Sequence, residues 1–312
     1  MRGRVLKTLS WLMGVTGLVV VVWYFGPENL PNLLGSVGIG GVTAWFALTF
    51  LARIIQVETT VAPLRVLQHP MRRSDAFWIG WLRTFANQIF PSAGVVAYAQ
   101  ALRQKTSISW SEMAALGAPQ FVLVAAALGL VGIVAVFSNA AILVESFFPL
   151  LLLYSAMVVA AVLITRGAPW LAKLLPGRLS QRLSAASAAL QKFAEHPSMI
   201  LLVIACHTAA ILLRGARMWL LFSTAGLNLD WNQMLLLVAI AESSMLIQLT
   251  PGGLGIREGA VLAGALLAGI PIELAAGIAL IDRFLIIAIA TLLAPPAILL
   301  LRSDTSRDDR NN

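Results

Sequence analysis

The sequence predicts an all-α integral membrane protein, a polytopic helical bundle with six full spans and two re-entrant helical hairpins related by an inverted repeat. Hydrophobic residues make up 59% of the 312 residues and charged residues only 12%. Several apolar runs approach or exceed the roughly 20 residues that cross a bilayer as a helix. Too little polar sequence separates these runs for a soluble domain. Residues 1–301 are therefore predicted to form one membrane-embedded domain, followed by a disordered cytoplasmic tail at 302–312.

The first predicted span covers residues 9–25 and follows three basic residues, Arg2, Arg4 and Lys7. It resembles a signal peptide, but no small-residue cleavage site follows it, and three consecutive aromatic residues at 23–25 form an interfacial belt instead. We therefore interpret this run as a span with the N-terminus in the cytoplasm. The other predicted full spans are residues 33–52, 112–137, 147–165, 197–222 and 273–301.

Two interrupted segments are predicted to enter the membrane and return on the same side. Residues 75–90 and 92–104 flank Pro91, and the second arm reaches only about 20 Å against an apolar core of about 30 Å. A re-entrant hairpin fits this length better than two spans. Around Pro251, the arm from Met234 to Thr250 is nearly long enough to cross, so the second hairpin is predicted on weaker grounds than the first.

Positive charge is distributed as expected for a membrane protein of the cell (inner) membrane with both termini in the cytoplasm. Five of the 22 Lys and Arg residues lie in apolar segments, and the other 17, including Arg53 and Arg65, lie in predicted cytoplasmic segments. Basic residues interleave with apolar ones in the loop 166–195, which is predicted to lie on the anionic cytoplasmic leaflet. This pattern explains the basic composition without nucleic acid, which is not predicted as a partner.

The stretch Pro251-Gly-Gly-Leu-Gly-Ile-Arg-Glu258 combines helix-breaking residues with two adjacent charges. Pro251 lacks a backbone donor, and Gly252, Gly253 and Gly255 permit backbone angles closed to other residues, so a helix should end here and restart near Ile256. The restarting helix would present free N–H groups and the positive end of its dipole to an anion such as phosphate. The alternative is an ordinary turn outside the membrane.

Ionisable groups in apolar segments are costly unless they are paired or face water, so each is a candidate functional residue. They are Arg83, Arg214, Arg217, Glu242, Arg257, Glu258, Asp282 and Arg283. The four arginines of the second half could together receive a lipid phosphate. Two alternatives stay open: Arg257 or Arg283 paired with Glu242, Glu258 or Asp282 would lock helices together, and Arg214 and Arg217 could instead reach the outer headgroups.

An internal repeat relates segments about 160 residues apart. Gln88 and Pro91 match Gln248 and Pro251, and the similarity continues downstream, which defines repeat halves at about 75–137 and 233–301. Three predicted spans separate the hairpins, and an odd number makes the halves face opposite ways. Inverted repeats with interrupted helices are typical of transporters that bind substrate near the membrane midplane.

The motif 251–258, followed by Gly269-Ile270 and residues 279–283, resembles the signature of the lysylphosphatidylglycerol synthase transmembrane, or flippase-like, domain family. The segment Asn87-Gln88-Ile-Phe-Pro91-Ser-Ala-Gly94 is similar to the family's first-half motif, and the resemblance extends from about residue 44 to residue 301. It implies movement of lipids between leaflets or a role beside glycolipid pathways. Gln120 stands where the family pattern suggests an arginine, and no aminoacyl-transfer domain follows.

The residues and the resemblance together favour a lipid flippase-like transporter for a phospholipid or phosphate-bearing glycolipid with an anionic or zwitterionic headgroup. Two alternatives are a membrane-embedded transferase acting on a lipid-linked sugar, for which Glu258 or Glu242 would be the general base, and a non-transporting partner of lipid-synthesis enzymes. The three histidines are scattered without metal-ligand spacing, and nucleotide-binding and hydrolase motifs are missing. We therefore predict no metal and no cofactor.

Overall fold

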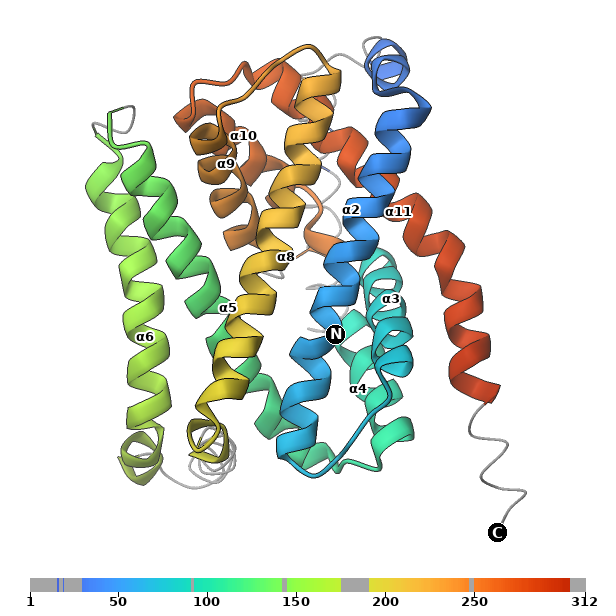
Figure 1. Cartoon of the computed structure of the whole chain (residues 1–312), viewed down its shortest axis with the longest axis vertical. Coiled ribbons are helices and arrows are strands. Elements are labelled where there is room, and N and C mark those ends of the chain that lie inside the picture. Colours follow the sequence, from blue (N-terminus) through green and yellow to red (C-terminus); the bar gives the residue numbers. More distant parts are fainter. Residues whose placement is uncertain are drawn as a thin grey trace.

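The computed structural model describes residues 16, 19, 30–90, 93–141, 145–174, 191–246 and 250–303. This part of the chain is a bundle of α-helices without strands (Figure 1). Its long helices are α2 (Leu30–Val66), α5 (Trp110–Ser138), α6 (Phe147–Leu174), α8 (Pro197–Thr224) and α11 (Ile272–Ser303). Each of the five is long and apolar enough to cross a membrane. The protein is therefore a multi-pass membrane protein.

These five helices confirm five of the predicted spans, most to within a few residues. The prediction for residues 9–25 lies outside the described residues, apart from residues 16 and 19. The helix that contains the span predicted at residues 33–52 is longer than that span, because α2 continues through Arg53 to Val66. A polar side chain such as that of Arg53 does not end a helix when a neighbouring helix supplies a partner for it. Most of the loop 166–195 and of the tail also lies outside the described residues, although α6 and α11 extend to residues 174 and 303.

Four shorter helices form two antiparallel hairpins. The first consists of α3 (Arg73–Ile89) and α4 (Ala93–Thr106), and the second of α9 (Trp231–Ser243) and α10 (Ile256–Leu267). At about 1.5 Å per residue each helix is about 18–26 Å long, less than an apolar core of about 30 Å. The two hairpins lie in opposite halves of the bundle, α3–α4 in the lower half and α9–α10 in the upper half of Figure 1.

The first arm of the second hairpin ends earlier than predicted. The sequence predicted a helix as far as Thr250, whereas α9 ends at Ser243 and a short 3-10 turn, η2 (Ser244–Leu246), follows. The hydroxyl of Ser243 donates to the carbonyl of Ala239, and that of Ser244 donates to the carbonyl of Ala241. Serine hydroxyls that bond the backbone in this way slightly weaken the helical ladder, and two of them lie here at the end of α9.

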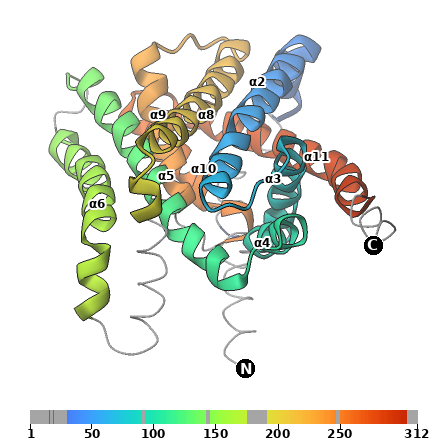
Figure 2. The ribbon, with the colours of Figure 1, turned by 60° about the horizontal axis from the view of Figure 1, so that its bottom comes forward.

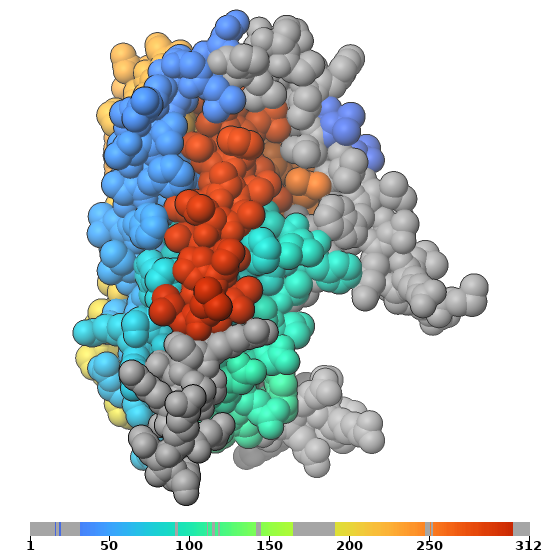
Figure 3. All heavy atoms as spheres, turned by 90° about the vertical axis from the view of Figure 1, so that its right-hand side faces the viewer, coloured from blue at the N-terminus to red at the C-terminus, as the bar shows by residue number. Residues whose placement is uncertain are grey.

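The long helices pack in pairs around the hairpins. Helix α2 packs mainly along α8, and α5 pairs with α6 at one side of the bundle in both ribbon views (Figures 1 and 2). The face in Figure 3 is formed by α2, α11 and the first hairpin. Buried apolar side chains form two clusters, one centred on α8, α9 and α11 and one joining the C-terminal half of α2 to the first hairpin. Among the described residues the second hairpin packs in the first cluster, whereas the first hairpin packs mainly in the second and adds Trp81 to the first.

A capping box begins α5. The hydroxyl of Ser109 accepts a hydrogen bond from the backbone N–H of Glu112 at 3.2 Å, and the Glu112 carboxylate accepts from the backbone N–H of Ser109 at 2.9 Å. A further hydrogen bond from the Ser109 hydroxyl to this carboxylate lowers the pKa of Glu112 to about 2. Glu112 precedes the apolar window of the helix, which starts at Pro119. It stays ionised at neutral pH and fixes the start of α5.

Close packing of α5 on α6 gives a prediction about two glycines of one helix. A β-carbon at Gly132 would lie 2.1 Å from the ring of Tyr154, which is fully buried, whereas one at Gly117 would meet nothing within 4 Å. We expect Gly132→Ala to destabilise the protein by about 1–3 kcal/mol through overpacking. Gly117→Ala should be neutral or slightly stabilising, since alanine favours helix. Thermal unfolding of both variants in detergent measures this, and equal midpoints would contradict the α5–α6 packing.

Candidate functional site

The glycine-rich motif forms the tip of the second hairpin. Residues Pro251–Gly253 form a 3-10 turn, η3, and α10 starts at Ile256, as predicted. The φ angles of Gly252, Gly253 and Gly255 are 55°, 73° and 77°. Side chains with a β-carbon rarely adopt these angles, so the turn requires glycine at all three positions.

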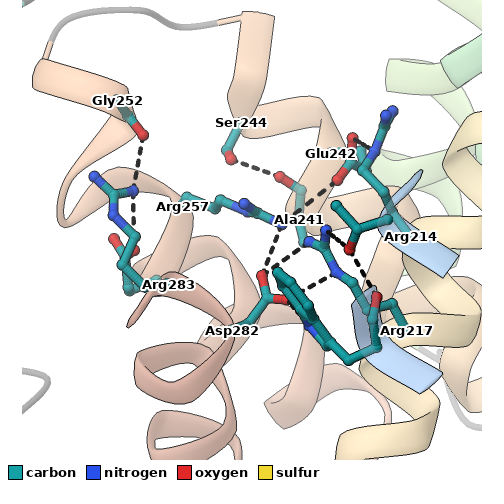
Figure 4. Close-up of polar contacts among 12 residues, drawn as sticks. Arg214, Arg217, Ala241, Glu242, Ser244, Gly252, Arg257, Asp282 and Arg283 are labelled. Atoms are coloured by element: carbon teal, nitrogen blue, oxygen red, sulfur yellow. Dashed lines mark hydrogen bonds and ion pairs between the residues drawn. The ribbon is translucent and has the colours of Figure 1, made fainter. Parts of the chain in front are cut away.

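Glu258 occupies the N-terminus of α10. One carboxylate oxygen accepts a hydrogen bond from the backbone N–H of Gly255 at 2.7 Å. The other pairs with Nη1 of Arg283 at 3.3 Å, and the same Nη1 donates to the carbonyl of Gly252 at 2.8 Å (Figure 4). The chain's own carboxylate therefore sits where the sequence predicted an external anion, and Arg283 ties α11 to the hairpin tip.

The tips of the two hairpins meet. A β-carbon at Gly252 would lie 2.6 Å from Oε1 of Gln88 on α3 and 3.0 Å from Nη2 of Arg283. Asn87, next to Gln88, accepts a hydrogen bond from the backbone N–H of Gly94 at 2.9 Å and so joins α3 to α4. Pro91 lies outside the described residues. The two motifs that the sequence pairs by repeat are thus in contact through Gln88 and the glycine turn.

Asp282 on α11 is the centre of a buried ion network. Its Oδ1 lies 2.9 Å from Nε of Arg217, and its Oδ2 accepts a hydrogen bond from Nη2 of Arg217 at 3.0 Å, so the ion pair is bidentate. The indole N–H of Trp45 donates to Oδ1 at 2.9 Å, and Nη2 of Arg257 lies 3.2 Å from Oδ2. The Arg217 guanidinium also lies over the Trp45 ring at 4.8 Å and reaches the hydroxyl of Thr49 at 3.3 Å. Side-chain exposure is 3% for Arg217 and 4% for Asp282, so the pair is isolated from lipid and water.

The network continues through Glu242 on α9. Arg214 holds one oxygen of Glu242 at 2.6 Å, and Arg257 lies 3.8 Å from the other. Arg257 therefore stands between two carboxylates that each have a closer arginine (Figure 4). Arg257, Glu258, Asp282 and Arg283 also line a small cavity of about 10 Å³.

The structure brings together seven of the eight embedded ionisable residues singled out from the sequence. Arg257 pairs with Glu242 and Asp282, and Arg283 pairs with Glu258, as the ion-pair alternative proposed. Arg214 and Arg217, which were not part of that alternative, also form ion pairs and point into the protein rather than out to headgroups. The eighth, Arg83 on α3, instead lies over the ring of Tyr98 at 5.2 Å. Among the described residues no group of three His, Cys, Asp or Glu side chains could hold a metal ion.

Sequence reasoning missed three polar members of α2, namely Trp45, Thr49 and Arg53. Trp45 and Thr49 join the Asp282 network, and Nη2 of Arg53 donates to the hydroxyl of Thr84 at 2.6 Å. They follow one another at intervals of four residues, which places them on one helix face. This spacing was the available signal, but a tryptophan and a threonine in a span look like ordinary packing residues.

Comparison with known proteins agrees with the membrane fold and with the family suggested by the glycine motif. The family model described as the lysylphosphatidylglycerol synthase TM region matches residues 11–294. No curated protein and no solved structure matches the chain significantly. Because the match includes both hairpins and the whole ion network, the chain belongs to the lysylphosphatidylglycerol synthase transmembrane family.

Proposed function

We propose that the protein is a flippase-like transporter that moves a phosphate-bearing lipid between the leaflets of the cell membrane. The observation that carries the proposal is the surplus charge of Arg257. Glu242 and Asp282 are each held more closely by another arginine, at 2.6 Å by Arg214 and at 2.9 Å by Arg217, whereas Arg257 lies 3.8 and 3.2 Å from them. A lipid phosphate would give Arg257 an anionic partner that it does not share with another arginine.

Charge balance in the whole cluster supports the same conclusion. Four arginines, Arg214, Arg217, Arg257 and Arg283, face three carboxylates, Glu242, Glu258 and Asp282. A buried excess of one positive charge is costly in a membrane and favours an anionic ligand. Glu258, at the N-terminus of α10, would orient Arg283 toward that ligand or hold the cationic part of a zwitterionic headgroup.

The position of the cluster supports transport over simple binding. It lies where the tips of two short-helix hairpins meet, and the hairpins belong to opposite halves of the bundle. Paired interrupted helices around a central site are the arrangement by which many transporters alternate access between the two sides of a membrane. In this proposal each hairpin belongs to one half of the inverted repeat and is re-entrant. Rocking of the two hairpins exposes Arg257 to each leaflet in turn.

Reconstitution into liposomes tests the function directly. The probe is a phosphatidylglycerol with a fluorescent headgroup, whose outer-leaflet copies are bleached by a membrane-impermeant reductant. Protein-dependent bleaching of inner-leaflet lipid without a new covalent product is the expected result. Exchange no faster than in protein-free liposomes would contradict transport. A new lipid-linked product in the presence of a sugar donor would instead establish the transferase alternative.

A further inference from the structure

Two loops meet at the base of the first hairpin, at the lower end of the bundle in Figure 1. One is the loop before α3, residues 67–72, and the other follows α4, residues 107–109. In the first loop, Nδ1 of His69 lies 3.2 Å from the carbonyl oxygen of Thr106, the last residue of α4. Nε2 of the same ring lies 3.5 Å from Oε1 of Glu112 in the first turn of α5. The ring thus connects the two ends of the hairpin with each other and with α5.

Both partners of the His69 ring are hydrogen-bond acceptors. A backbone carbonyl and an ionised carboxylate accept hydrogen bonds and donate none. A neutral imidazole carries one N–H and can donate to only one of them, whereas an imidazolium ring carries two. The two contacts of His69 are therefore complete only when the ring is protonated.

The carboxylate of Glu112 is a constant partner over the relevant pH range. Hydrogen bonds from Ser109, together with the contact with His69, hold the pKa of Glu112 at about 2. A histidine normally gains its second proton between about pH 5 and 8, where this carboxylate is ionised throughout. A change of pH in that range therefore acts on the ring and leaves the charge of its partner unchanged.

Basic residues of the neighbouring stretches repel a protonated His69. Arg73 is paired with Glu58, and the guanidinium of Arg103 lies over the ring of Trp110 at 5.4 Å. The other basic residues within four positions of His69 or Thr106 are Arg65, Arg72 and Lys105. Attraction by Glu112 and repulsion by these residues act on the same ring, so its protonation is open to change with pH.

Both ends of the contact lie beside an uncommon backbone conformation. Gln68, next to His69, has a φ of 64°, and Ser107, next to Thr106, has a φ of 55°. No other non-glycine residue in the described ranges has a positive φ. Side chains with a β-carbon seldom hold such angles unless surrounding contacts fix them. The bond between His69 and Thr106 is one contact that fixes the two loops in this form.

We propose that His69 is a pH-dependent latch that closes the base of the first hairpin when its ring is protonated. The imidazolium donates to Thr106 and to Glu112 and holds α4 and α5 to the loop before α3. As the pH rises the ring loses one proton, the shorter contact with Thr106 is kept, and the link to α5 is lost. The latch rests on the proposed function only for its consequence for transport, which is that the closed form restrains rocking of the hairpin.

Hydrogen–deuterium exchange of the purified full chain in detergent tests the latch without an assay of transport. Amides of residues 67–72 are followed in wild type and His69→Gln at about pH 5.5 and about pH 8, on either side of the usual titration of histidine. Comparison of variants at equal pH cancels the intrinsic pH dependence of amide exchange. At the lower pH the wild type should exchange about two- to fivefold more slowly than the variant, as expected for a partly exposed ion pair. At the higher pH the two should exchange at nearly equal rates.

Two further variants serve as partner and control. Glu112→Gln removes the charge of the acceptor but keeps a side chain that completes a capping box, so the extra protection at the lower pH should be lost as in His69→Gln. His196→Gln should leave the exchange of the loop at the wild-type rate. His196 is exposed, and its one described ring contact is with the carbonyl of Lys192 at 2.9 Å.

Equal exchange in wild type and His69→Gln at the lower pH would overturn the latch. Protection of the same size at both pH values would overturn its dependence on the second proton, and full protection in Glu112→Gln would overturn the link to α5. If His69→Gln does not fold, Glu112→Gln is judged by the same loss of protection at the lower pH.

The liposome assay tests the consequence for transport. At about pH 6.5, where an ordinary histidine is half protonated, His69→Gln should exchange lipid about twofold faster than the wild type, and at about pH 8 equally fast. Equal rates at both pH values would overturn the control of transport by the latch. If neither protein exchanges lipid, the proposed function fails, and the hydrogen-exchange result still decides whether the latch exists.

Discussion

Replacing Asp282 by Asn should destabilise the folded protein by about 3–5 kcal/mol, the cost of removing one partner of a buried ion pair. Asn is nearly the same size, so the loss comes from charge and hydrogen bonding and not from a cavity. Arg217 would lose its bidentate carboxylate and keep only Thr49 and the Trp45 ring. Of its two ion pairs described above, Arg257 would keep the longer one, with Glu242 at 3.8 Å. The measurement is the unfolding midpoint in detergent and the yield of monodisperse protein.

Glu145→Gln is the control, because it removes an exposed carboxylate and should leave the midpoint unchanged. Adding Arg217→Met to Asp282→Asn should recover part of the loss, since the variant then no longer buries an arginine without its carboxylate. A midpoint for Asp282→Asn equal to that of the control would mean that the network does not hold α8 and α11 together.

Replacing Arg257 by Gln should reduce protein-dependent lipid exchange by about tenfold or more while the protein still folds. Removal of this charge leaves Glu242 with Arg214 and Asp282 with Arg217, so every carboxylate in that part of the network keeps an arginine. Arg283→Gln should lower exchange as strongly but also weaken the fold, since Glu258 would then rely on the N–H of Gly255.

Exchange is measured in the liposome assay, with folded yield determined for each variant from the same preparation. Arg65→Gln serves as the control for loss of a single exposed charge. Wild-type exchange by Arg257→Gln would reject the phosphate site. If Arg257→Gln gives no folded protein, the ion pairs of Arg257 are instead required for folding, as the alternative interpretation of the sequence holds.

The spans could be predicted because their signal is local. Runs such as residues 197–222 and 273–301 are apolar throughout, and α8 and α11 agree with them closely. The break in the helix at the glycine turn could be predicted because proline and glycine interrupt helices, and the positive φ angles there are ones that glycine permits. The early end of α9 could not be predicted from residue type, because serine is found both inside and at the ends of helices.

The partners of the embedded charges could not be predicted, although the charges themselves were identified. Trp45 and Asp282 are 237 residues apart, and nothing local in either segment indicates their contact. Arg53 was assigned to a cytoplasmic loop because a charge at the end of an apolar run normally marks a boundary. Its place beside Trp81 and Thr84 depends on the packing of α2 against α3, which only the three-dimensional structure provides.

The pairing of Arg217 with Asp282 links assembly to the order of synthesis. The two residues are 65 positions apart, so α8 leaves the ribosome with both its arginines well before α11 is made. An arginine at the centre of a span costs about 2.5–3.5 kcal/mol during insertion, and α8 must meet that cost from its apolar residues or stay within the insertion machinery. A chain released before residue 282 would contain α8 but would lack Asp282, the carboxylate that pairs with Arg217 of α8. Correct assembly of the membrane domain therefore depends on completion of its last helix.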